Sequence, residues 1–162
     1  MVRADTCLIN TIKVFTIKIL FYFPETLRLY GPVFQLFRTA SRDYKLEKSN
    51  LTIRKGTLTI IPIYSIHTDP EFYPDPEKFD PERFSEENKK NRHPMAHLPF
   101  GDGPRNCIGL RFGLMQSKIA LAQLLLNFKF SPTSRTTIPM RFDTRSLTLA
   151  PHNDMWLKME KL

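Results

Sequence analysis

The longest regular hydrophobic pattern lies in residues 108–128, where apolar side chains recur every three or four positions. That spacing gives one side of an α-helix a broad apolar face, so it predicts a helix from Ile108 to Phe128. The face is formed by Leu110, Leu114, Leu121, Leu124, Leu125 and Phe128. We expect the helix to end at Asn127 or at Ser131-Pro132, because proline interrupts a helix.

A second helix is predicted near the amino terminus, over Glu25 to Tyr30. Pro24 suits its first turn and would break a helix arriving from upstream. Gly31-Pro32 should end it, because glycine and proline commonly follow a helix. Residues 1–23 are apolar and β-branched without a clear period, which fits a strand or an irregular terminus.

Short strands are predicted on both sides of the proline-rich centre of the chain. They are Tyr44–Leu46, Leu51–Ile53 and Thr57–Ile61, with a turn at Lys55-Gly56, and further strands within Met140–Lys161, which turns at Pro151–Asp154. Eight of the 13 prolines fall between Pro62 and Pro104, which predicts ordered coil and short turns. Within that stretch we expect one helical turn at Pro76–Phe79 and a charged loop at Ser85–His93.

Composition places the chain among globular proteins, with 41% hydrophobic and 25% charged residues. The net charge of +8 is explained most simply by solubility, or more specifically by an acidic partner or a negative membrane surface. The scattered basic residues and the absence of a nucleic-acid-binding motif argue against a nucleic-acid partner. Ile12–Phe23 is too short to span a bilayer and contains Lys13 and Lys18, so we read no membrane anchor or targeting signal.

The most informative chemistry lies in the glycine-rich run from Phe100 to Gly109, which contains Cys107. A cysteine binds metals as the thiolate, and a helix N-terminus favours that charged form. Because the predicted helix starts at Ile108, Cys107 should benefit from this effect. Arg105 could bind a carboxylate of the same ligand, and Gly103 would let the backbone approach a bulky group.

Simpler interpretations of the same residues remain open at this point. A lone buried cysteine usually acts as a small hydrophobic residue. A zinc site needs four ligands, and His93 and His97 are separated by Pro94, which disfavours a helical pair of ligands. A phosphate-binding loop would carry glycine-lysine-serine or glycine-lysine-threonine, which the sequence lacks.

The run resembles the haem-binding signature Phe-x-x-Gly-x-Arg-x-Cys-x-Gly of the cytochrome P-450 family at every defined position. The resemblance implies that Cys107 is the catalytic proximal thiolate and the axial ligand of haem iron. It also implies that Arg105 contacts a haem propionate, with Arg38 as a second propionate contact. The remaining cofactor-binding positions of the signature are Phe100, Gly103 and Gly109.

Two upstream motifs strengthen this resemblance. Glu25-Thr26-Leu27-Arg28 alone would be an exposed ion pair, and Pro81-Glu82-Arg83-Phe84 alone would be a turn. In this order they are similar to the family's Glu-x-x-Arg motif and its downstream arginine. The resemblance implies one buried network of Glu25, Arg28 and Arg83 beneath the haem, while His67, in the intervening stretch, is expected to be a structural hydrogen-bonding residue.

The resemblance covers about Glu25 to Leu162 and is closest to microsomal, insect-type members. It implies the C-terminal portion of a mainly α fold with small β-sheets (α+β), over residues 24–162, preceded by a leader at 1–23 outside the family. Pro24 and Gly31 depart from the family pattern, and we expect a truncated or mis-assembled gene model. We expect no counterpart in this sequence of the family's membrane anchor or of its distal, oxygen-activating helix.

By resemblance the parent enzyme is a haem-thiolate monooxygenase of the endoplasmic reticulum membrane. It would insert one atom of O2 into a lipophilic substrate with electrons from an NADPH-dependent reductase. The alternatives are a non-enzymatic remnant, at best a weak haem binder, and a haem-thiolate isomerase or peroxygenase. A basic face for the reductase is predicted at Lys89, Lys90, Arg92, Arg111 and Lys118, and segments 33–36 and 146–148 are expected to line the substrate pocket.

Overall fold

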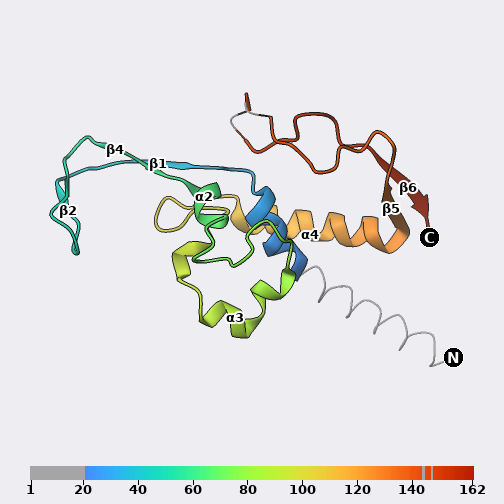
Figure 1. Ribbon diagram of the computed structural model, residues 1–162, viewed down its shortest axis with the longest axis horizontal. Coiled ribbons are helices and arrows are strands. Elements are labelled where there is room, and N and C mark those ends of the chain that lie inside the picture. Colours follow the sequence, from blue (N-terminus) through green and yellow to red (C-terminus); the bar gives the residue numbers. More distant parts are fainter. Residues whose placement is uncertain (1–20, 144, 147) are drawn as a thin grey trace.

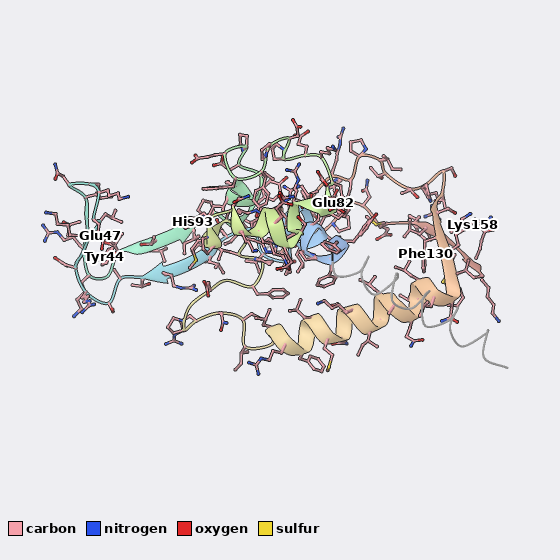
Figure 2. The ribbon with its side chains drawn as sticks, turned by 90° about the horizontal axis from the view of Figure 1, so that it is seen from below. Tyr44, Glu47, Glu82, His93, Phe130 and Lys158 are labelled. Carbon is pink, nitrogen blue, oxygen red and sulfur yellow. The ribbon has the colours of Figure 1, made fainter. Side chains whose placement is uncertain are left out.

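The chain extends from an amino-terminal helix to a carboxy-terminal hairpin in a computed structural model, which describes residues 21–143, 145–146 and 148–162. Helix α4 (Leu110–Asn127) is the longest element described. Strands β1 and β4 project to one side, and β5 and β6 lie beyond the far end of α4 (Figure 1). In Figure 2, Tyr44 and Glu47 mark the first end of this elongated arrangement, and Phe130 and Lys158 mark the other.

The amino-terminal helix ends where the sequence predicts but does not begin there. Residues 21–30 are helical, so Pro24 lies inside the helix, and the prediction that it opens the helix was wrong. Gly31 follows the last helical residue, and a Cβ atom at this position would lie 2.6 Å from the Leu27 carbonyl oxygen. A side chain at position 31 would clash with this oxygen, which explains why glycine stands at the end of the helix. The rest of the predicted leader, residues 1–20, lies outside the described residues.

The described strands pair as three separate antiparallel ribbons of two strands each. Strand β1 (Leu36–Thr39) pairs with β4 (Leu58–Ile61), and β2 (Tyr44–Lys45) pairs with β3 (Thr52–Ile53). Strands β2, β3 and β4 correspond to predicted strands, whereas β1 was not predicted. Its side chains alternate between partly buried and exposed, with Leu36 and Arg38 on the partly buried face.

The proline-rich centre contains only short helical segments, as predicted. Helix α2 (Ile63–His67) is followed by 3-10 turns at Pro81–Phe84 and Pro94–Ala96. Pro76–Phe79 is not helical, although the Lys78 amide donates to the Asp75 carbonyl, closing a single turn at 3.0 Å.

The predicted charged loop at Ser85–His93 contains helix α3 (Glu86–Lys90), so that prediction was wrong. The Ser85 hydroxyl caps it by accepting a hydrogen bond from the Asn88 amide at 3.4 Å. Two glutamates occupy its first turn and two lysines its last turn, an arrangement that complements the helix dipole. The cap and these charges stabilise helix α3, although it has no apolar face.

Helix α4 begins two residues later than predicted and ends at Asn127, one of the two predicted ends. None of its side chains is buried. Apolar residues also occur outside the predicted face, and Phe112, Met115 and Ile119 are more than half exposed. No helix among the described residues has the length and apolar character needed to cross a membrane.

The carboxy-terminal region contains less β-strand than predicted. Strand β5 (Phe128–Pro132), which follows α4 directly, was not predicted, and it pairs with β6 (Leu157–Lys161). Between them, a single isolated bridge among the described residues joins Phe142 and Pro151. The observed combination of helices and small antiparallel sheets confirms the predicted α+β class.

The described core is small and contains charged side chains. Its apolar members are Leu29, Ile63, Tyr73, Phe84 and Ala96, and its buried polar members are Glu25, Arg28 and His67. These residues come from the amino-terminal helix, from α2 and from the proline-rich coil that follows it. The core therefore holds the coil that leads into the glycine-rich loop.

Candidate functional site: the cysteine loop and its buried support

The glycine-rich loop has a constrained backbone. Gly101 and Gly103 have φ angles of +71° and +80°, a left-handed conformation that strains residues with a side chain. The Gly101 amide donates to the Leu98 carbonyl at 3.0 Å, and the Cys107 amide donates to the Phe100 carbonyl at 2.9 Å. The loop thus folds back on itself and fixes the backbone at the cysteine.

Cys107 carries a free, exposed thiol on this loop. It lies three residues before the first residue of α4, so the prediction that the helix starts directly after it was wrong. The intervening residues form a turn in which the Leu110 amide donates to the Cys107 carbonyl at 3.2 Å. A Cβ atom at Gly109 would lie 3.9 Å from the sulfur, so glycine at that position leaves this flank of the thiol open.

Two arginines lie beside the loop. Arg105 is exposed, and the Arg38 guanidinium donates to the Arg105 carbonyl at 3.4 Å. Leu36, on the same face of β1 as Arg38, approaches the other end of the loop, where a Cβ atom at Gly101 would lie 3.2 Å from its side chain. Strand β1 therefore brings the two predicted propionate contacts together. Phe100 is partly buried at the start of the loop.

Glu25 and Arg28 form a fully buried, two-pronged ion pair. The Arg28 Nε and Nη2 atoms donate to the two carboxylate oxygens of Glu25 at 2.7 and 2.8 Å. The guanidinium also donates to the backbone carbonyls of His67 at 2.7 Å and Pro76 at 2.8 Å. A buried charge pair is tolerated when its remaining hydrogen-bonding groups are satisfied, and these carbonyls meet that requirement.

Arg83 joins the same cluster through a longer contact. Its Nε atom lies 3.7 Å from Glu25 Oε1 and has no hydrogen-bond partner among the described residues, while its Nη2 atom donates to the Asp75 carbonyl at 2.9 Å. The Asp80 amide donates to the same glutamate oxygen at 2.9 Å. The three residues of the predicted network are thus brought together, with the Glu25 carboxylate as their shared negative charge.

His67 and His97 form a second buried unit that sequence reasoning did not anticipate as a pair. Their rings stack with centroids 5.3 Å apart, and Phe84 meets His97 edge-on at 4.7 Å. Burial lowers the pKa of His67 to about 4 and that of His97 to about 3, so both rings are neutral at pH 7. His67 is the structural hydrogen-bonding residue predicted, but no sequence pattern links it to His97.

Comparison with known proteins decides which family this arrangement represents. The family model described as cytochrome P450 matches residues 22–157, most of the chain. The chain belongs to the cytochrome P450 family. The resemblance drawn from the cysteine signature and its two upstream motifs is therefore confirmed at family level.

Curated cytochromes P450 from insects and from a mammal match 83–85% of the chain. Probable cytochrome P450 6a14 of Drosophila melanogaster is 52% identical over 85% of this chain and 27% of its own length. Cytochrome P450 9e2 of Blattella germanica is 48% identical over 85% of this chain and 26% of its own length. Cytochrome P450 3A16 of Mus musculus is 48% identical over 83% of this chain and 26% of its own length. The chain thus spans about a quarter of the length of these relatives.

Family membership directs attention to haem, and the residues of the loop fit such a group. Haem is flat and brings its own iron, which can take a cysteine thiolate as axial ligand, and the exposed Cys107 thiol could serve as that ligand. Its propionates need cations, and Arg38 and Arg105 lie beside the loop. A Cβ atom at Gly103 would meet nothing within 4 Å, so this part of the loop has open space in front of it.

The basic residues predicted as a docking face differ in their availability. Arg92 is not free for a partner, because its guanidinium stacks on Tyr73 and Phe84 at 4.7 and 4.6 Å and donates to the Arg83 carbonyl. Its inclusion in that face was therefore wrong. Lys89 pairs with Glu86 at 2.8 Å, on the exposed side of α3. Lys90 and Arg111 are exposed, and Lys118 lies 6.0 Å from the Phe23 ring.

Residues of both segments expected to line a substrate pocket lie around one cavity in this cytochrome P450 chain. The Leu149 amide donates to the Pro32 carbonyl at 3.3 Å and joins the flanks of the two segments. The cavity has a volume of about 390 Å³. Its lining includes Phe34, Gln35, Tyr64, Phe142, Ser146 and Thr148.

Proposed function

We propose that this chain is the C-terminal, proximal portion of a haem-thiolate monooxygenase, with Cys107 as the axial ligand of haem iron. The observation that carries the proposal is the exposed Cys107 thiol on a loop whose backbone is fixed by its own hydrogen bonds. A thiol held in this way needs little reorganisation to bind a metal. The buried pair of Glu25 and Arg28 would support the polypeptide from which the loop extends.

The other residues of the site would hold the cofactor. Arg105 and Arg38 would bind the propionates with charge-assisted hydrogen bonds. Gly103 and Gly109 would let the macrocycle approach the backbone, and Phe100 would shield the sulfur from water. Haem with a thiolate ligand would supply the activation of O2 that allows one oxygen atom to enter a substrate.

The partners of the reaction follow from the same family. Electrons would come from an NADPH-dependent reductase, whose acidic surface would meet Lys89, Lys90, Arg111 and Lys118. Family resemblance also points to the endoplasmic reticulum membrane. A lipophilic substrate suits the cavity between segments 33–36 and 146–148, because Phe34, Tyr64 and Phe142 give it aromatic walls.

A haem binder without turnover is a second candidate, favoured by one observation. Every side chain of α4 is at least partly exposed, including large apolar ones, so the described residues do not enclose a reaction chamber around the cysteine. A peroxygenase or isomerase, which needs no reductase, is a third candidate.

Turnover of a lipophilic aryl ether separates these candidates. The haem-loaded chain and its Cys107→Ser variant would be supplied with O2, NADPH and a cytochrome reductase, or with hydrogen peroxide alone. The monooxygenase proposal expects dealkylation with reductase that depends on Cys107. Product with peroxide but none with O2, NADPH and reductase would indicate a peroxygenase, and haem uptake without product would indicate the binder.

The same assay tests the docking face. Reversing the charge of Arg111 and Lys118 should slow the reductase-supported reaction, whereas reversing Lys45 in the distant β2–β3 hairpin should not. Equal rates in the two charge-reversed chains would remove the docking proposal.

A further inference from the structure

His67 lies between the buried ion pair and the cysteine loop and uses both of its ring nitrogens. It is the last residue of α2 and is only 1% exposed. Its Nε2 atom accepts a hydrogen bond from the Leu98 amide at 2.9 Å. The proton of the neutral ring must therefore be on Nδ1, which donates to the Arg28 carbonyl at 3.1 Å.

The bond to Leu98 is the first of a series of backbone contacts that reaches the backbone of Cys107. The Leu98 carbonyl accepts from the Gly101 amide at 3.0 Å, and the Phe100 carbonyl accepts from the Cys107 amide at 2.9 Å. On the other side, the Arg28 guanidinium donates to the His67 carbonyl at 2.7 Å. His67 thus connects the helix of the buried ion pair to the loop of the cysteine.

His97 makes a parallel connection one residue before Leu98. Its Nε2 atom lies 3.2 Å from the Pro24 carbonyl, in the helix that also carries Arg28. Its ring is nearly parallel to that of His67, at 24°. The two imidazoles therefore tie the start of the loop to the same helix at two points.

We propose that His67 and His97, as a stacked neutral pair, position the cysteine loop against the helix of Glu25 and Arg28, and that protonation of the pair releases the loop. The role in ligand positioning rests on the proposed function of Cys107. The acid-sensitive connection rests only on contacts within the chain. His67 acts through the loop and is a positioning residue rather than a catalytic one.

Protonation disrupts the connection for a chemical reason. A protonated His67 has a hydrogen on Nε2, which would then face the Leu98 amide as donor against donor. A proton on His97 would add a second charge next to His67 and near the guanidinium groups of Arg28 and Arg92. The carboxylate of this cluster, Glu25, is already held by two hydrogen bonds from Arg28 and gives no relief.

The direction of the pH effect follows from the lowered pKa values of both rings. In the released state each imidazole has a pKa near 6.5, whereas in the folded state the pKa is about 4 for His67 and about 3 for His97. The released state binds more protons between these limits, so acid favours it. The connection is complete above pH 6.5 and weakens as the pH falls toward 4.

Proton NMR of the full chain tests the pair directly, because the sequence has four histidines. Free imidazole and a short histidine peptide serve as external references, with an ordinary pKa of about 6.5. His67 and His97 should remain neutral at least about one pH unit below the references. Titration of all four imidazoles together near that reference value would overturn the proposal.

Amide hydrogen exchange then tests the link to the loop. Between about pH 6.5 and 4, the protection factors of Leu98, Gly101 and Cys107 should fall by up to about tenfold per pH unit for each imidazole that titrates. The amides of strands β5 and β6 should keep their protection factors. Equal losses in the loop and in these strands would indicate global unfolding and contradict a local release.

Two substitutions of His67 separate positioning from mere packing. The H67Q variant keeps an oxygen acceptor for the Leu98 amide but cannot take up a proton, so loop protection at pH 7 should persist and its loss should move to lower pH. The H67N variant keeps only the donor side, so loop protection should already fall at pH 7. The exposed H152Q variant serves as a control. Identical behaviour of H67Q and H67N would overturn the proposal.

Reconstitution with haem distinguishes failure of this inference from failure of the proposed function. If Cys107 is the axial ligand, the spectrum of thiolate ligation should disappear over the same pH range as loop protection, and at lower pH in H67Q. Histidines that titrate as proposed in a chain without such a spectrum would contradict only the function. A thiolate spectrum in a chain whose His67 and His97 titrate like free imidazole would contradict only this inference.

Discussion

Arg28 joins more segments of the chain than its ion pair with Glu25 alone would require. Its guanidinium binds both oxygens of Glu25 and the carbonyls of His67, Pro76 and Lys78, which lie on two further segments. It also lies 4.9 Å from the centre of the Tyr73 ring. One side chain thus joins the amino-terminal helix, the end of α2 and the proline-rich coil.

Replacing Arg28 with leucine should strongly destabilise the chain. The substitution leaves the buried Glu25 carboxylate without its main partner, which typically costs about 3–5 kcal/mol of unfolding free energy. The matched control is Arg54→Leu, since Arg54 pairs with Asp43 at 3.1 Å where both side chains are exposed. That change should cost less than about 1 kcal/mol. Urea unfolding at pH 7 measures both values, and equal costs would contradict the role given to the buried pair.

The sequence alone predicts the members of this cluster unevenly. Glu25 and Arg28 stand three residues apart and are visible as a pair, but Arg83 joins them only through family resemblance. The stacking of His67 on His97 and of Arg92 on Tyr73 follows no sequence spacing. Such contacts depend on how the coil folds, and the short-range pattern of residues does not encode them.

At the scale of elements, the length of a helix or strand decides whether its sequence pattern can be recognised. Helix α4 has 18 residues of largely regular spacing, so its start was predicted to within two residues, and it ends at one of the two positions predicted. Strand β1 has only four residues, which is too short for a period to be recognised. Helix α3 has clear capping and charge signals but only five residues, and apolar periodicity alone misses it.

Two glycines provide a matched test of the loop backbone. A Cβ atom at Gly103 or at Gly113 would meet nothing within 4 Å, so neither substitution creates a clash. They differ in conformation, since Gly103 has a φ of +80° and Gly113 lies within α4.

Alanine should therefore have opposite effects at the two positions. Gly103→Ala should cost about 1–2 kcal/mol of unfolding free energy through left-handed strain. Gly113→Ala should raise the free energy of unfolding by up to about 1 kcal/mol, because alanine has a higher helix propensity than glycine. Thermal unfolding compares the variants under identical conditions. A stabilising Gly103→Ala would show that the loop does not have the described backbone.

At the scale of the whole molecule, the chain separates into a buried polar centre and elements that extend away from it. The centre holds the cysteine loop through β1, His67 and His97, whereas α4 and the β5–β6 pair extend away from it (Figure 1). Large apolar side chains of α4 and of this strand pair are exposed. The chain spans only about a quarter of the length of its curated relatives. The described residues account for the ligand side of the proposed haem site, and the sequence motifs predicted that side because they are contiguous and specific.

The central claim is that the Cys107 thiol binds haem iron, and the reduced carbon-monoxide spectrum tests it most directly. The chain and its Cys107→Ser variant would be reconstituted with haem, reduced and exposed to carbon monoxide at pH 7, with His152→Gln as a control for substitution itself. We expect the strongly red-shifted band of a thiolate-ligated haem in the unsubstituted chain and in the control, and its loss in Cys107→Ser. The same spectrum with and without Cys107 would contradict the claim.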